Sequence, residues 1–189
     1  MTREEALSTI DELVKMPNIR KHCLATEAVM LSIWDYLESQ GRSDLGSRED
    51  WGVVGLLHDA DYEVTDKDLE KHTKVIEEKL KKMGERKEII NGILAHAERV
   101  PKTTALEKAI FACDELTGLI VAAALVLPDK KLANLKVESV EKRFREPAFA
   151  RAVDRGSIKT CESDLGIPLL KFCEIALLSM QKISGDLGL

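Results

Sequence analysis

Hydrophobic positions recur every three or four residues along most of the chain, and no segment alternates with a period of two. This pattern is typical of amphipathic helices and predicts an all-α protein. Pro17, Gly41, Gly84, Pro128 and Pro147 separate the helical segments. The helices predicted in this way cover residues 2–14, 19–40, 47–58, 67–83, 86–97, 104–127, 137–145, 148–153 and 168–183.

Local capping signals set several of the predicted helix ends. Thr2 and Thr104 each precede a glutamate by three residues, which is the spacing of a capping box, and Ser47 precedes Asp50 in a similar way. Asp66 is predicted to cap the helix of residues 67–83. Toward the C-terminus the pattern weakens, and a turn is expected at Gly156.

The length of 189 residues fits one domain with a single core. We expect a single globular multi-helix domain over residues 1–189, with its core at about 18–127 and a helical C-terminal part at about 129–184. An apolar helix face serves a dimer interface as well as a core, so a homo-oligomer stays open.

Composition narrows the classes of partner. Only 4% of the residues are aromatic and the formal net charge is -5, so no nucleic-acid polymer is expected as a partner. The longest uncharged run, residues 116–128, is well short of the roughly 20 residues that cross a bilayer, and no membrane partner is expected. The first residues lack the pattern of a signal peptide, and the four cysteines lack C-x-x-C spacing. These features favour a reducing, cytoplasmic location.

The candidate chemistry starts from the histidines. Each of the four shares a predicted helix face with apolar residues three, four or seven positions away, and they are His22, His58, His72 and His96. Any one of them is readily explained as a core histidine that is hydrogen-bonded to a carbonyl. Four inward-facing imidazoles on four helices together favour a shared metal.

Two aspartates complete the candidate metal site. Asp114 lies in the middle of an apolar predicted helix, where a carboxylate needs a cation or a salt bridge. Asp59 directly follows His58, although a residue in a C-terminal turn would also explain it. Imidazoles and carboxylates without thiolates favour an open, catalytic divalent ion such as Mn, Fe, Co, Ni, Zn or Mg. Six ligands suit one ion with outer-shell histidines or two ions.

Four stretches carry a resemblance to a known family: KHCLATEAVM, GLLHDADYE, GILAHAE and ACDELTGLI. In this order they resemble the HD-domain superfamily of metal-dependent phosphohydrolases, specifically the small predicted hydrolases of HDIG type. The resemblance implies an HD-domain fold with a helical C-terminal extension. It also implies that His22, His58, Asp59 and Asp114 bind the first ion, that His72 and His96 match the extra ligands of two-metal members, and that Asp59 bridges both ions.

One departure from the family concerns the substrate. The cyclic-dinucleotide phosphodiesterases of the HD-GYP branch have a lysine where this chain has Tyr62, and no GYP motif is present. The resemblance therefore argues against a cyclic dinucleotide as the substrate.

The expected reaction is hydrolysis of a phosphomonoester or phosphodiester of a small molecule, such as a nucleotide, by a metal-activated water. Asp59 would orient the water, and Asp61 or Glu63 would assist proton transfer, although both also fit a solvated acidic turn. Residues 129–160 hold nine basic and five acidic residues. We therefore expect Arg143 or Arg145, with Lys21, to face the substrate; ordinary exposed helix charges are the alternative.

Two other functions stay open. An HD-fold module without activity would bind a nucleotide or a partner protein and use the metal for stability or sensing. A His and carboxylate dimetal site also supports hydrolysis or oxygenation of substrates without phosphate.

Overall fold

The computed structural model describes residues 1–189 and consists of α-helices without strands, which confirms the predicted all-α fold. The helices are α1 (Arg3–Leu13), α2 (Pro17–Ser39), α3 (Arg48–Leu57), α4 (Lys74–Lys82), α5 (Lys87–His96), α6 (Ala105–Leu125), α7 (Val137–Phe144), α8 (Arg155–Leu165), α9 (Leu169–Lys182) and α10 (Ser184–Leu187), with a short 3-10 helix η1 (Leu132–Asn134).

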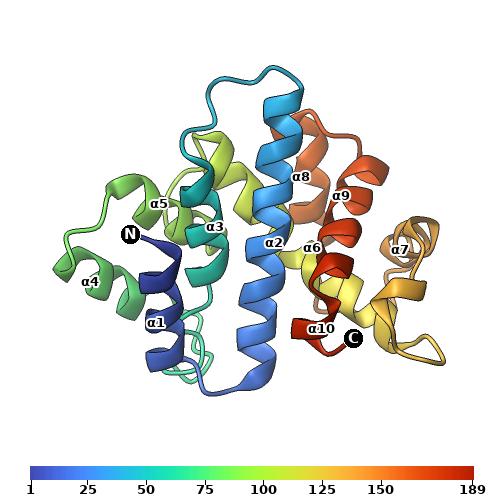
Figure 1. The fold of residues 1–189 in the computed structure, drawn as a ribbon, viewed down its shortest axis with the longest axis horizontal. Coiled ribbons are helices and arrows are strands. Elements are labelled where there is room, and N and C mark those ends of the chain that lie inside the picture. Colours follow the sequence, from blue (N-terminus) through green and yellow to red (C-terminus); the bar gives the residue numbers. More distant parts are fainter.

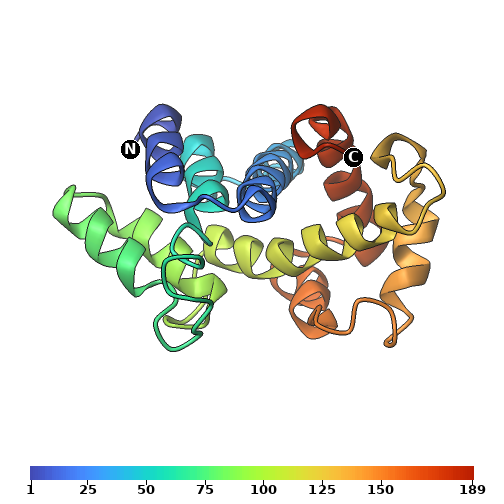
Figure 2. The same ribbon diagram turned by 90° about the horizontal axis from the view of Figure 1, so that it is seen from below.

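The long helices α2 and α6 organise the structure. In Figure 1, α2 runs through the middle, with α1 and α3 on one side and α9 on the other. Figure 2 shows α6 passing below α2 and α3, with α8 on its opposite side. One hydrophobic cluster of 48 buried residues extends from Ala6 to Leu187 and joins these layers. None of the helices is long and apolar enough to span a bilayer.

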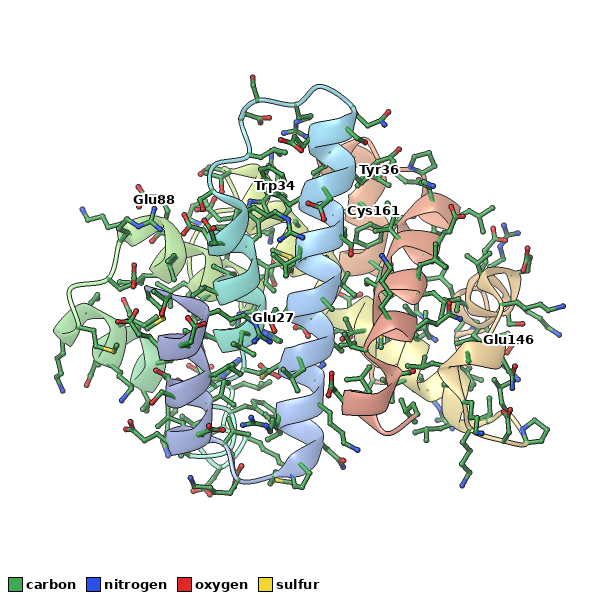
Figure 3. All side chains as sticks on the ribbon, in the orientation of Figure 1. Glu27, Trp34, Tyr36, Glu88, Glu146 and Cys161 are labelled. Carbon is green, nitrogen blue, oxygen red and sulfur yellow. The ribbon has the colours of Figure 1, made fainter.

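A close approach of α3 to α2 brings together two of the candidate histidines. A Cβ on Gly55 would lie only 2.9 Å from the backbone N and Cα of Glu27, so the two helices meet backbone against backbone. The Glu27 side chain, labelled in Figure 3, is buried and accepts a hydrogen bond from Arg3 Nε at 2.5 Å. This packing brings the end of α3, where His58 follows, close to His22 on α2.

The capping boxes predicted at Thr2 and Thr104 are present, whereas Ser47 makes no side-chain cap hydrogen bond at the start of α3. Thr2 and Thr104 accept hydrogen bonds from the amides of the glutamates three residues later, and each glutamate side chain bonds back to the capping residue. These ends depend only on neighbouring residues, which explains why the pattern located them.

The predicted helix of residues 67–83 was wrong in its first half. Residues 67–73 form turns, and Asp66 does not cap a helix but adopts a left-handed conformation with φ of 55°. The helix α4 begins only at Lys74 because Asp61 supplies its cap from outside. The Asp61 carboxylate accepts hydrogen bonds from the amides of Thr73, Val75 and Ile76 at 3.0 to 3.1 Å.

The prediction also failed between residues 148 and 165. Residues 148–153 form turns instead of a helix, and the expected turn at Gly156 lies inside the unpredicted helix α8. Asp154 caps α8 by accepting from the Gly156 amide at 2.8 Å. The Arg155 side chain donates to the carbonyls of Ala150 and Val153 at 2.7 and 2.9 Å, which stabilises the turns that precede the helix.

Candidate metal centre

The fold gathers six potential metal ligands from separate segments. His22 lies on α2, His58 and Asp59 follow α3, His72 lies in the turn before α4, His96 ends α5, and Asp114 lies on α6. They are the four histidines and two aspartates that the sequence singled out, and their ligand atoms form two groups.

The first group is formed around His22. Its Nε2 lies 3.0 Å from His58 Nε2, 2.9 Å from Asp114 Oδ1 and 3.4 Å from Asp59 Oδ2. His58 Nε2 in turn lies 3.4 Å from Asp114 Oδ1 and 3.8 Å from Asp59 Oδ2. Two imidazole nitrogens and two carboxylate oxygens thus converge on one point.

The second group uses the other oxygen of Asp59. Asp59 Oδ1 lies 3.2 Å from His72 Nε2 and 3.6 Å from His96 Nε2, and these two nitrogens are 2.9 Å apart. Since each carboxylate oxygen of Asp59 faces a different pair of histidines, Asp59 stands between the two groups.

The donor set fits two divalent ions that share Asp59. A metal–nitrogen bond of about 2.1 Å places two ligand atoms about 3.0 Å apart at right angles and about 3.4 Å apart in a tetrahedral arrangement. The separations of 2.9 to 3.8 Å fall near these values. Both groups satisfy the geometric requirement for holding an ion, as His22, His58 and Asp59 and as Asp59, His72 and His96.

Hydrogen bonds donated by Nδ1 orient three of the histidines. His58 Nδ1 donates to the Gly55 carbonyl at 2.8 Å, and His96 Nδ1 donates to the Ile93 carbonyl. His72 Nδ1 donates to Asp61 Oδ1 at 2.9 Å. With the proton held on Nδ1, each ring presents the lone pair of Nε2 to the centre, which is the tautomer that binds a metal.

The buried hydroxyl of Thr117 gives His22 the same orientation. Thr117 Oγ1 donates its hydrogen to the Asp114 carbonyl at 2.8 Å, so at His22 Nδ1, 3.1 Å away, it can only accept. The His22 ring therefore carries its proton on Nδ1 and directs Nε2 toward Asp114 Oδ1. Sequence reasoning missed Thr117; its place one helical turn after Asp114 was the available signal.

Protons and charges are strongly coupled in this cluster. Burial lowers the pKa of His22, but its hydrogen bond to Asp114 and the charges of Asp114 and Asp59 raise the pKa to about 9. Burial likewise opposes protonation of His72, while Asp59 and Asp61 raise its pKa to about 9. Burial raises the pKa of Asp59, but His58 and His72 hold it well below its usual range. An ion binding here must therefore displace protons.

The metal centre opens into a cavity of about 540 Å³. His22, Asp59 and Asp114 are 25%, 17% and 23% exposed along its wall, so Asp114 lies at a cavity rather than in the core as predicted. The lining includes six acidic side chains, and Arg99 is its one Lys or Arg residue. Arg99, which follows α5, donates to the Leu69 carbonyl and was missed because nothing in its sequence context distinguishes it.

The two acidic residues predicted to transfer protons lie elsewhere. Asp61 is fully buried, and its oxygens accept from His72 and from the start of α4, so it positions these groups. Glu63 Oε2 accepts from the amides of Lys15 and Met16 at 2.8 and 2.7 Å, just before α2. Neither carboxylate lines the cavity. Asp61 and Glu63 are therefore corrected to structural roles.

The predicted substrate cations are also not brought to this cavity. Arg143 pairs with Glu146 at 2.6 Å, and Figure 3 labels Glu146 at the edge of the molecule beyond α9. Arg145 pairs with Glu141 at 2.5 Å, and its side chain is 71% exposed. Lys21 lines a second, neighbouring cavity. Arg143 and Arg145 are therefore held in local ion pairs, and neither lines the metal cavity.

Comparison with known proteins supports the same interpretation. The family model of the HD domain matches residues 19–119, which is more than half of the chain and contains all six candidate ligand residues. Searches of the curated proteins and of the solved structures gave no match. The chain therefore belongs to the HD-domain family, within the superfamily of metal-dependent phosphohydrolases.

Proposed function

We propose that the protein hydrolyses a phosphomonoester or phosphodiester of a small molecule, such as a nucleotide. The observation that carries the proposal is the position of Asp59, whose two oxygens face two histidine pairs at the wall of one cavity. When bound, two divalent ions supply a water of lowered pKa and neutralise the oxygens of a phosphoryl group.

The residues of the chain contribute orientation and charge. Asp59 fixes the position of the nucleophilic water relative to the phosphorus atom, since it stands between the two ligand groups. Arg99 takes the role expected of Arg143 and Arg145, because it is the one Lys or Arg side chain that lines the cavity. Its guanidinium pairs with a phosphoryl oxygen.

The charge of the cavity favours a substrate with a single phosphate group. Six acidic side chains, one arginine and two divalent ions leave a formal charge of -1 before substrate binds. Such a cavity accepts one phosphate beside the ions but disfavours a polyphosphate or a nucleic-acid polymer. We also retain the expectation of a cytoplasmic location.

The test is phosphate release by protein stripped with a chelator and reloaded with Mn, Co, Ni or Mg. Release from a panel of small phosphoesters should require the metal and should be lost in His58→Ala. If the protein binds ions but hydrolyses no phosphoester, the proposal is wrong, and a binding module or a substrate without phosphate takes its place.

A second arm of the experiment tests the assigned cation. Arg99→Gln should raise KM for an active ester about tenfold or more, as expected for loss of a charged hydrogen bond. Arg143→Gln is the matched control and should leave KM unchanged, because Arg143 lies outside the cavity. The opposite ranking would restore the original assignment of Arg143.

A further inference from the structure

A second cavity of about 470 Å³ adjoins the metal centre. It lies between the start of α2, the later turns of α6 and residues 187–189, and the short helix α10 lies beside α2 at this end in Figure 1. His22 and Gly118 line both this cavity and the larger one at the metal centre. The two cavities therefore meet at these residues.

The second cavity differs from the first in chemistry. Its walls include the apolar side chains of Val121, Leu125 and Leu187, and it contains no acidic side chain. Lys21 supplies its only Lys or Arg side chain. Its chemistry therefore suits a mainly apolar group, whereas the acidic metal cavity suits a phosphate that is held by cations.

Gly118 is the one glycine within the longer helices that packing does not explain. A Cβ on Gly55 or Gly92 would meet neighbouring atoms at 2.9 or 2.8 Å, and one on Gly52 would meet Leu31 at 3.1 Å. A Cβ on Gly118 would meet nothing within 4 Å. Glycine destabilises a helix interior relative to alanine. At position 118 no packing contact requires glycine, so the fold alone does not account for it.

Gly118 lies on the face of α6 that lines both cavities. It lies one helical turn beyond Asp114, and Val121 and Leu125 continue along α6 on the side that lines the second cavity. From Asp114 to Leu125 the helix rises about 16 Å, which is enough for a phosphate and an attached organic group. A side chain at Gly118 would project into the junction of the cavities.

We propose that the second cavity binds the apolar organic group of the phosphoester, and that Gly118 keeps the passage from the metal centre open. This inference rests on the proposed hydrolase function for the location of the phosphate. It identifies the substrate class as a monophosphate ester of a mainly apolar organic group, with Lys21 available for one polar atom.

The experiment compares binding of phenylphosphonate and methylphosphonate, which are not hydrolysed, to the metal-loaded protein by calorimetry. The wild-type protein should bind phenylphosphonate about tenfold more tightly, since burying a phenyl ring is favourable. Gly118→Leu should reduce that preference, the ratio of the two affinities, to less than about twofold, with metal content measured on the same sample. Gly118→Ala should raise Tm by about 2 °C. Ala122→Leu, on the same helix but outside both cavities, should retain the preference.

Equal binding of the two phosphonates by the wild-type protein would overturn the inference. So would a preference that persists in Gly118→Leu or that is lost equally in Ala122→Leu. The two proposals can be contradicted separately. Hydrolysis of phosphoesters without a preference between the phosphonates would contradict only the role of the second cavity. A preference for phenylphosphonate without hydrolysis of any ester would contradict only the hydrolase function.

Discussion

Asp61 accepts a hydrogen bond from Nδ1 of His72 at 2.9 Å, and the same carboxylate caps the start of α4. One buried side chain thus orients a candidate metal ligand and caps the start of a helix. Metal binding at the second ligand group and the local stability of α4 are therefore linked through Asp61.

Asp61→Asn should weaken both properties. The amide retains one acceptor oxygen and directs N–H groups at the backbone donors, so we expect a loss of about 2–3 kcal/mol in the free energy of unfolding. Affinity for the second ion should fall about 10- to 100-fold, as for other outer-shell changes. Urea unfolding and metal titration measure the two effects. Asp66→Asn, in the same turn but exposed, is the control and should change neither.

Thr117→Val tests the orientation of His22. The substitution preserves the shape of the side chain but removes the acceptor at Nδ1, so affinity at the first ligand group should fall about 10- to 100-fold. Thr117→Ser should restore it. Thr26→Val, which removes a buried hydroxyl without a hydrogen-bond partner, should leave affinity unchanged. A loss of metal in Thr26→Val equal to that in Thr117→Val would attribute the effect to general destabilisation.

The number of bound ions tests the shared role of Asp59. His96→Ala removes one ligand of the second group only, so elemental analysis should find one fewer ion per chain. Asp59→Ala removes a ligand common to both groups and should reduce the content of both ions. If His96→Ala and Asp59→Ala bind equal amounts of metal, the two groups do not act as separate sites.

The metal-free protein should lose stability as pH rises from 6.5 to 8. The pKa values of His22 and His72 are raised to about 9 in the folded state, above the ordinary value of 6.5. Their stabilisation is complete below pH 6.5 and is lost as pH rises toward 9, at roughly 1–2 kcal/mol per pH unit. Urea unfolding at several pH values measures this slope. His72→Asn should reduce it, whereas a flat or rising profile in the wild-type protein would contradict the assignment.

The sequence located the features that depend on neighbouring residues. Capping boxes at Thr2 and Thr104 gave correct helix starts, and the order of histidines and aspartates indicated all six residues that converge. The prediction for His72 was partly correct. It points to the centre as expected, but Asp61 orients it in a turn, whereas the prediction placed it on a helix face.

The features that could not be predicted from the sequence depend on contacts between residues that the pattern does not reveal. The start of α4 is set by Asp61, 12 to 15 residues earlier in the chain. The basic residues of α7 were assigned to the substrate from local charge alone, but such a count does not reveal that Arg143 and Arg145 are paired with Glu146 and Glu141. Arg99 could be recognised as a candidate only from the fold, which places it on the cavity wall.

The walls around the metal centre come from two different stretches of the chain. All six candidate ligand residues lie within residues 19–119, whereas Asp154 and Ser157 line the first cavity and residues 187–189 line the second. Residues outside the matched segment therefore complete the walls of both cavities. Exchanging the C-terminal helices between HD proteins would be a route to new substrates that leaves the chemistry of the centre intact.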